Sequence, residues 1–202
     1  MRVFLAGATG VIGVRLLPLL IETGHVVAGM TRSPRKATQI AAVGGEPIVC
    51  DVYDGEALTE AVVGFAPEAV VHQLTDLPDS LTDLRRHAAA NDRMRTEGTR
   101  NLVAAAQAAG TGRFVAQSIA WRPTGRAAAV EAHEQKVLAI RGVVVRYGRL
   151  YGPGTFYDDE LPPPPRVHVD EAARATPALL EAPSGIVTVV DPKERGARVT
   201  SM

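Results

Sequence analysis

The sequence has a single cysteine and no net charge, and each shortage excludes a class of function. Cys50 alone cannot form an internal disulfide framework or a metal site built from several cysteines. The 22 basic residues equal the 22 acidic residues in number, so no sequence-wide charge attracts nucleic acid or an anionic membrane. We therefore expect neither as a partner.

Long apolar runs are also missing. The stretch that most resembles a targeting signal, residues 3–14, contains three glycines and ends at Arg15. It is shorter than the roughly 20 apolar residues that cross a bilayer. We therefore expect no export signal and no membrane segment, and together with the single cysteine this predicts a cytoplasmic protein.

What the sequence does contain is an alternation of short apolar runs and longer alanine-rich stretches. With 46% hydrophobic and 22% charged residues, its composition is that of a globular protein. Short apolar runs between helices are typical of strands buried on both faces. The predicted fold class is therefore α/β, with a doubly wound parallel sheet of about seven strands. The predicted strands are residues 2–6, 25–30, 46–50, 69–72, 113–117, 143–147 and 186–190.

Helices are predicted between these strands. Ser33 followed by Pro34 is typical of a helix start, and Gly24 and Gly110 are typical of helix ends. Four consecutive prolines, residues 162–165, cannot be helical and predict an extended connector. The predicted helices are residues 11–23, 34–43, 56–64, 81–109, 127–140 and 169–181.

Glycines 7, 10 and 13 form the strongest local motif. They lie between the first predicted strand and the first predicted helix, as in a Rossmann turn that binds a dinucleotide pyrophosphate. Glycine permits a tight turn, close approach of the phosphates and close helix packing. The alternative is a glycine-rich turn without a ligand. The predicted cofactor-binding residues here are Gly7, Thr9, Gly10, Val11, Ile12 and Gly13.

The end of the second predicted strand favours NADP(H) over NAD(H). NAD-binding sites usually place an acidic side chain there to hold the ribose 2′-hydroxyl, whereas this chain has Thr31, Arg32 and Ser33, with Arg35 and Lys36 following. Cations and hydroxyls suit a 2′-phosphate. The alternative is that these are solvated charges at a helix start, where the helix dipole disfavours cations.

Several further segments occur in an order and spacing that are specific when taken together with the glycine motif. They are Asp51-Val52, residues 70–75, the Gly98-Thr99-Arg100-Asn101-Leu102 segment, Ser118, residues 146–154 ending in Tyr-Gly-Pro-Gly, and His168-Val169-Asp170-Glu171-Ala172-Ala173. With these segments the chain resembles the extended and atypical short-chain dehydrogenase/reductase superfamily, specifically the NAD-dependent epimerase/dehydratase group and its NmrA-like relatives.

The resemblance implies roles for individual residues. Asp51 and Val52 would contact adenine, and the strand end at Gln73, Leu74 and Thr75 would pass the cofactor ribose. It also implies one NAD(P)-binding Rossmann domain over residues 1–202, in which residues 155–185 form a reduced substrate-side segment. Relatives pair through the two helices that flank the fifth strand, which predicts a homodimer through residues 81–109 and 127–140.

The superfamily's Tyr-x-x-x-Lys pair, in which lysine lowers the pKa of the catalytic tyrosine, is absent. The residues four before the three lysines, Lys36, Lys136 and Lys193, are Arg32, Ala132 and Val189. Two hydroxyl side chains remain as candidate catalytic residues. Ser118 resembles the family's active-site serine, and Tyr147 ends the sixth predicted strand, so both are predicted to reach the same cleft. The alternatives are a serine that bonds to backbone and a tyrosine that packs in the core.

Other polar residues receive structural interpretations. His133 and Lys136, beside Glu131 and Glu134, have the spacing of a solvated, ion-paired helix face. His72 is predicted to pack beneath the cofactor. The five histidines have no ligand spacing, which predicts no metal site. Residues 73–80 follow a strand and are a candidate substrate loop.

Two functions remain open from the sequence. The first is an NADP(H)-dependent oxidoreductase or epimerase-like enzyme that acts on an unknown small carbonyl or alcohol. The second is a non-catalytic, NmrA-like sensor of the nucleotide. The absent Tyr-x-x-x-Lys pair favours the sensor, whereas Ser118 and the loop after His72 favour the enzyme.

Overall fold

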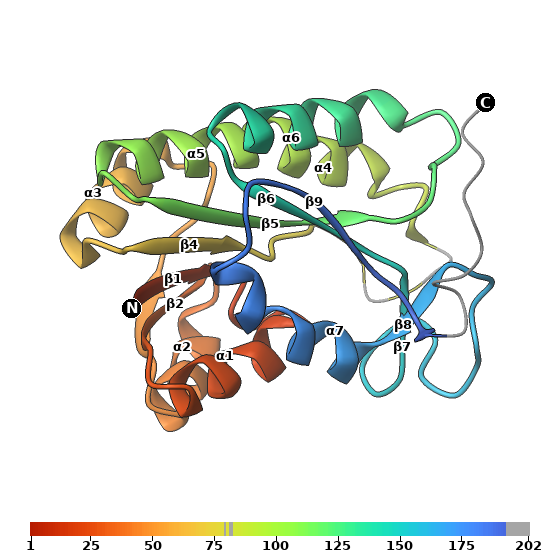
Figure 1. Ribbon diagram of the computed structural model, residues 1–202, viewed down its shortest axis with the longest axis horizontal. Helices are drawn as coiled ribbons and strands as arrows, with labels where there is room; N and C mark the ends of the chain where they lie inside the picture. Colours follow the sequence, from red (N-terminus) through yellow and green to blue (C-terminus); the bar gives the residue numbers. More distant parts are fainter. Residues whose placement is uncertain (79, 81–82, 193–202) are drawn as a thin grey trace.

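A computed structural model describes residues 1–78, 80 and 83–192 of the chain (Figure 1). Seven parallel strands form one sheet in the order β3-β2-β1-β4-β5-β6-β9, which confirms the predicted doubly wound α/β fold. The order reverses between β1 and β4, which are hydrogen-bonded neighbours. The strands are β1 (Arg2–Ala6), β2 (Val26–Thr31), β3 (Glu46–Val49), β4 (Ala69–His72), β5 (Arg113–Ile119), β6 (Val143–Tyr147) and β9 (Gly185–Val189).

Helices cover both faces of the sheet, as Figure 1 shows. One face carries α1 (Gly13–Glu22), α2 (Pro34–Ala42) and α7 (Val169–Ala175). The other carries α3 (Gly55–Phe65), α4 (Ala88–Arg93), α5 (Thr99–Ala108) and α6 (Ala127–Ala139). None of the helices in the described ranges is long and apolar enough to cross a membrane.

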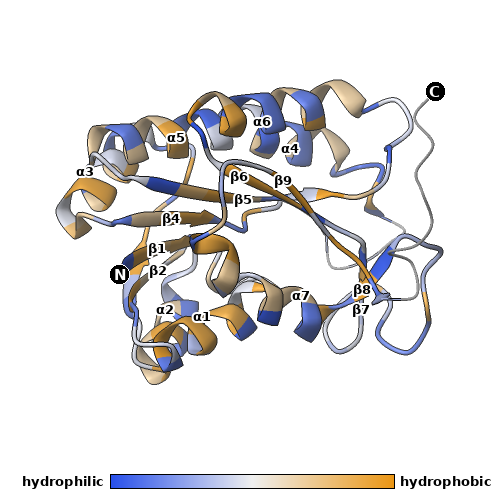
Figure 2. Cartoon of the chain, in the orientation of Figure 1, coloured by the Kyte–Doolittle hydropathy of each residue, from blue (hydrophilic) through white to orange (hydrophobic). Residues whose placement is uncertain are grey.

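Two apolar layers hold these helices to the sheet. Leu16 and Leu20 of α1 are buried against one face, and Leu58 and Leu102, of α3 and α5, against the other. In Figure 2 the central strands are largely hydrophobic, whereas the helices mix hydrophobic and hydrophilic residues. Burial of strands on both sides explains why their sequences read as continuous apolar runs.

The structure corrects two helix boundaries. The helix predicted over residues 81–109 begins at Ala88 and passes through a π-helical turn, Met94–Gly98; residues 81 and 82 of that prediction lie outside the described ranges. The helix predicted over residues 169–181 ends at Ala175 and continues as a 3₁₀ turn, Pro177–Leu180. Pro177 has no amide hydrogen to donate to the preceding turn, so the α-helix cannot continue through it.

Two short strands were not predicted. β7 (Arg149–Tyr151) and β8 (Arg166–His168) pair in parallel outside the main sheet. The segment between them contains the four prolines, and residues 161–165 adopt neither helix nor strand. Strands of three residues carry too little alternation to be recognised in a sequence.

Candidate functional site at the carboxyl edge of the sheet

The glycine turn lies where the strand order reverses. Gly7 has a φ of +92°, and a Cβ there would lie 2.9 Å from the backbone carbonyl of Gln73. The amides of Gly7 and Ala8 donate to the carbonyl of Met30 at 3.3 and 3.2 Å, and the Gly10 amide donates to the Gly7 carbonyl at 3.0 Å. The turn is therefore bonded to β2 and lies directly against the backbone that follows β4.

Helix α1 begins directly after this turn. A Cβ at Gly13 would lie 2.8 Å from the backbone of Ala8, so only glycine permits this packing. The Val14 amide donates to the carbonyl of Gly10 at 3.0 Å, so the turn runs directly into the first turn of the helix, at the positive end of the helix dipole. A turn that excludes side chains at positions 7 and 13 and leads into the positive end of a helix fits a dinucleotide pyrophosphate.

The end of β2 brings the predicted ribose-side residues together. Thr31 is buried, and its hydroxyl lies 3.0 Å from the hydroxyl of Thr9 and accepts from the Ser33 amide at 3.2 Å. Arg32 is exposed, and its Nη2 lies 3.4 Å from Oδ1 of Asp76. Ser33 precedes α2 as predicted, although its side chain makes no capping bond within the described part of the chain.

The loop after β3 is held by the Gly-Thr-x-Asn-Leu segment. Asn101 donates from Nδ2 to the carbonyl of Val52 at 3.0 Å, and Asp51 accepts from the Tyr53 amide at 2.9 Å. A Cβ at Gly98 would lie 3.4 Å from Cγ1 of Val52. The segment therefore orients residues 51–53, which the family resemblance assigns to adenine.

A directed chain of hydrogen bonds crosses the core beneath the end of β4. The Gln117 carbonyl can only accept, so Nε2 of His133, 2.9 Å away, carries a hydrogen. Nδ1 of His133 then accepts from the Thr99 hydroxyl at 2.7 Å, and Thr99 accepts from Nε2 of His72 at 3.1 Å. Nδ1 of His72 finally accepts from the Leu74 amide at 3.2 Å.

Both histidines in this series of hydrogen bonds are neutral. Burial lowers the pKa of His133 to about 4, with the positive charge of Arg95 acting in the same direction, and burial lowers the pKa of His72 well below its usual value. His72 therefore packs inside the protein next to the glycine turn, where it supports Leu74.

This burial corrects one prediction. His133 and Glu134 were expected on a solvated helix face, but both are buried, and the His133 ring meets the His72 ring edge-on with centroids 5.4 Å apart. Exposed Glu131 and half-buried Lys136 do not share their environment. The spacing of the four side chains along α6 does not indicate which side of the helix faces the sheet.

Of the strand-end residues after β4, Gln73 is buried and Thr75 is exposed. The Gln73 amide donates to the Ala6 carbonyl at 2.8 Å, and the Leu74 carbonyl accepts from Nε2 of Gln117 at 3.3 Å. These bonds fix the backbone of residues 73 and 74 beside the end of β1, where a ribose would pass. Residue 79 of the candidate substrate loop lies outside the described ranges.

Ser118 belongs to a buried polar network. Its hydroxyl donates to Oε1 of Glu134 at 2.5 Å, and Arg146 donates to both carboxylate oxygens of Glu134 at 2.9 and 2.5 Å. Burial by itself would raise the pKa of Glu134, but the bonds from Arg146 and Ser118 outweigh it, so the pKa is lowered and Glu134 is ionised.

Tyr147 lies on the opposite face of the sheet. Thr176 donates to the Ala172 carbonyl at 2.8 Å, so the Tyr147 hydroxyl donates to Thr176, at 2.6 Å, and accepts from Nε2 of Gln73 at 3.5 Å. Tyr147 is 3% exposed, and burial raises its pKa. In the β5–β6 register Tyr147 pairs with Ile119 rather than with Ser118. The structure therefore does not bring the two candidate catalytic hydroxyls together.

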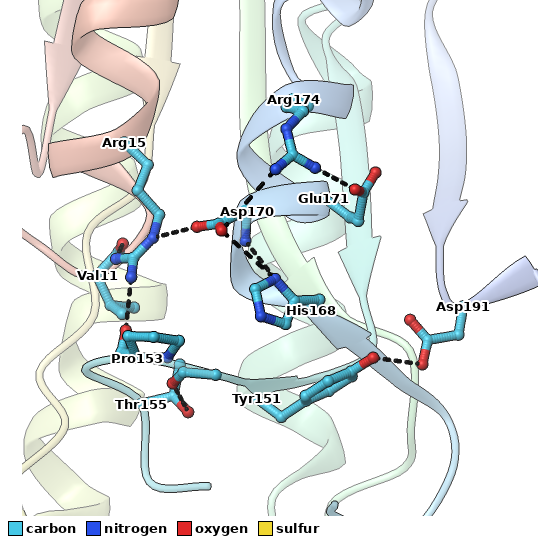
Figure 3. Close-up of polar contacts among 11 residues, drawn as sticks. Val11, Arg15, Tyr151, Pro153, Thr155, His168, Asp170, Glu171, Arg174 and Asp191 are labelled. Atoms are coloured by element: carbon cyan, nitrogen blue, oxygen red, sulfur yellow. Dashed lines mark hydrogen bonds and ion pairs between the residues drawn. The ribbon is translucent and has the colours of Figure 1, made fainter. Parts of the chain in front are cut away.

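Arg15, which was not predicted as a site residue, ties the glycine turn to the C-terminal part of the chain (Figure 3). Its guanidinium donates to the Val11 carbonyl at 2.8 Å, to the Pro153 carbonyl at 2.6 Å and to Oδ1 of Asp170 at 2.7 Å. The charge and bond from Arg15 lower the pKa of Asp170. A basic residue two positions after the last glycine is the sequence signal that could have identified it.

The described ranges contain no group of three or more histidine, cysteine or acidic side chains that could hold a metal ion.

Comparison with known proteins agrees with this geometry. The sequence matches the model of an NAD(P)H-binding family over residues 7–140. A 3-diazoavenalumate denitrifying reductase of a Streptomyces species is 37% identical over 235 residues, which cover 95% of this chain and 76% of the reductase. A 3-beta-hydroxysteroid dehydrogenase of Mycolicibacterium neoaurum is 32% identical over 114 residues, which cover 56% of this chain and 31% of the dehydrogenase.

Solved structures share the fold. A UDP-glucose 4-epimerase of Thermotoga maritima, solved with UDP-glucose, has a TM-score of 0.77 at 16% identity, covering 94% of this chain and 77% of the epimerase. The Thermus thermophilus UDP-glucose 4-epimerase in complex with NAD has a TM-score of 0.77 at 21% identity, covering 94% of this chain and 78% of the epimerase. The chain therefore belongs to the NAD(P)H-binding family, with a reductase among its relatives and the epimerase/dehydratase fold of the short-chain dehydrogenase/reductases.

Proposed function

We propose that this protein binds NADP(H) in preference to NAD(H) and uses it to reduce or oxidise a small carbonyl or alcohol. The observation that carries the proposal is the glycine turn, whose φ at Gly7 and packing at Gly13 leave room for no side chain at the point where the strand order reverses. When bound, the nicotinamide would supply or accept a hydride, and the chain's own residues would hold and orient it.

The residues that would hold the cofactor come from four strand ends, those of β1, β2, β3 and β4. The turn and the start of α1 would bind the pyrophosphate, and the end of β2 would bind the ribose and any 2′-phosphate. The loop after β3 would contact adenine, and the segment after β4 would pass the ribose. The set consists of Gly7, Thr9, Gly10, Val11, Ile12, Gly13, Thr31, Arg32, Ser33, Asp51, Val52, Gln73, Leu74 and Thr75.

Preference for NADP(H) is supported by the exposed Arg32 guanidinium and by the lack of an acidic residue directly after β2 in the sequence. Arginine can form two parallel hydrogen bonds with the oxygens of a phosphate, whereas a ribose hydroxyl has only one oxygen to accept them.

Reduction is favoured over epimerisation because the reductase relative is 37% identical to this chain, whereas the two epimerases that share the fold are 16% and 21% identical. That relative is named for 3-diazoavenalumate, so the group that its name identifies is a diazo group and not a carbonyl. We keep the substrate class at small carbonyls and alcohols, with a diazo compound as the first alternative to assay.

Catalytic roles for Ser118 and Tyr147 remain predictions. The Ser118 hydroxyl donates to Glu134 and the Tyr147 hydroxyl donates to Thr176, so neither proton points to a substrate in this arrangement. Proton exchange by water or by another side chain is therefore part of the proposal.

The second candidate function is a nucleotide sensor of the NmrA-like type. It is favoured by the lack of a Tyr-x-x-x-Lys pair in the sequence and by the two internally bonded hydroxyls. The two functions differ in turnover. An enzyme consumes NADPH in the presence of a suitable carbonyl or diazo compound, whereas a sensor binds NADPH and NADP⁺ with different affinities and consumes neither.

Titration with NADPH and NADH, followed by nicotinamide fluorescence, tests the proposed cofactor. We expect saturable NADPH binding with a Kd in the micromolar range, about 1 to 100 μM, and weaker NADH binding. Arg32→Ala should weaken NADPH binding about tenfold and leave NADH binding nearly unchanged, because it removes a charged bond to phosphate. Equal loss for both nucleotides would contradict the assigned role of Arg32.

A further inference from the structure

The cation that would recognise a 2′-phosphate already has an acidic partner. Nη2 of Arg32 lies 3.4 Å from Oδ1 of Asp76, although the two residues are 44 positions apart in the sequence. Arg32 follows the end of β2 and Asp76 follows β4, and these strands flank β1 on either side. The ion pair therefore spans the carboxyl edge of the sheet beside the glycine turn.

Asp76 is the fixed member of this pair. Its side chain is 20% exposed, against 66% for that of Arg32. Its backbone amide donates to Oδ1 of Asn91 at 3.3 Å, which attaches the loop to α4. After burial, the negative charge of Asp76 is the next largest cause of the raised pKa of the Tyr53 hydroxyl.

This arrangement places a negative charge where NADP(H) and NAD(H) differ. A 2′-phosphate that approaches Arg32 must compete with Asp76 for the same guanidinium and is repelled by its carboxylate. A ribose 2′-hydroxyl meets no such repulsion, because a carboxylate accepts hydrogen bonds from hydroxyls. The segment after β4 thus places an acidic side chain beside Arg32, where the end of β2 itself has none.

We propose that Asp76 is a specificity-determining residue that limits the preference for a 2′-phosphorylated cofactor by pairing with Arg32. The inference rests on the proposed dinucleotide function and adds a residue that neither the glycine motif nor the end of β2 reveals. Arg32 and Asp76 act as one unit, in which arginine attracts the phosphate and aspartate opposes it.

The test is a double-mutant cycle read by NADPH and NADH affinity. Asp76→Asn keeps the shape of the side chain and removes its charge, so NADPH affinity should rise about fivefold, the equivalent of about 1 kcal/mol, with NADH affinity unchanged or lower. In an Arg32→Ala background most of that rise should disappear, because the charge that Asp76 masks is no longer present.

Asp83→Asn is the matched control. Asp83 lies later in the same connection and pairs with Arg86 instead, with its Oδ1 3.6 Å from Nη1 of that arginine. It should leave the NADPH to NADH affinity ratio unchanged, and circular dichroism confirms folding of each variant. An Asp76→Asn variant that folds and keeps the wild-type ratio overturns the inference while the proposed function stands. Wild-type protein that binds neither nucleotide overturns both.

Discussion

At the residue scale, the buried pair His72 and His133 makes stability depend on pH. The pKa of His133 falls to about 4 on folding because of burial, whereas the unfolded value is near 6.5. A histidine whose pKa is lowered on folding contributes its full stability above the unfolded pKa and loses it as the pH falls toward the folded pKa. The window is therefore pH 6.5 to about 4, and His72 acts in the same direction.

Urea unfolding at pH 7.5 and pH 5 measures this effect. We expect the free energy of unfolding to fall by about 2 kcal/mol from pH 7.5 to pH 5 from His133 alone, because in this interval the unfolded state binds a proton there that the folded state does not bind. His133→Gln should be less stable at pH 7.5, because it breaks the chain of bonds to Thr99 and Gln117, but should show a shallower pH dependence. A variant with the wild-type pH slope would contradict the assignment.

Only some of the site residues were predictable from the sequence. Gly7 and Gly13 were predictable because their role depends on local backbone geometry, and the structure places both against neighbouring backbone. The partners of Ser118 and Tyr147 were not, because they depend on the β5–β6 register and on which side of α6 faces the sheet. The Arg32 and Asp76 pair needed the strand order, which no local pattern encodes.

At the element scale, Arg15 joins α1, the segment after β7 and the start of α7. Arg15→Met keeps much of the side-chain length and removes all three bonds, so we expect the free energy of unfolding to fall by about 1 to 2 kcal/mol and residues 152–165 to become more sensitive to proteolysis. Chemical unfolding and limited proteolysis with mass spectrometry measure the two effects.

Arg174→Met is the control, because Arg174 pairs with Asp170 and Glu171 on the exposed side of α7 only. It should change stability by less than about 0.5 kcal/mol. Equal effects of the two substitutions would show that Arg15 contributes as an ordinary surface charge.

Most elements were predictable from the sequence because strands buried on both faces leave continuous apolar runs; β1, β4 and β6 have the predicted bounds. The exceptions have local causes. Pro177 interrupts the last predicted helix, and the π-helical turn Met94–Gly98 brings the Gly98 backbone close to Val52, a contact between distant segments.

At the scale of the whole molecule, we propose a homodimer through the alanine-rich outer surfaces of α5 and α6. Ala104 and Ala132 are exposed on these helices, and small side chains let helices approach closely. Ala132→Glu should therefore weaken dimerisation at least tenfold, as measured by sedimentation velocity. Ala41→Glu introduces the same charge at an exposed position of α2 and should not change the sedimentation coefficient. A wild-type protein that sediments as a monomer at all concentrations would contradict the proposal.

A matched pair of glycine substitutions tests whether the glycine turn, where the strand order reverses between β1 and β4, holds a dinucleotide. A Cβ at Gly13 meets the backbone of Ala8, whereas a Cβ at Gly64, in α3, meets no atom within 4 Å among the described residues. NADPH affinity should therefore fall at least tenfold in Gly13→Ala and stay within about twofold of wild type in Gly64→Ala, with both variants folded by circular dichroism. A folded Gly13→Ala variant that binds NADPH as tightly as Gly64→Ala would show that the glycine turn does not hold the dinucleotide.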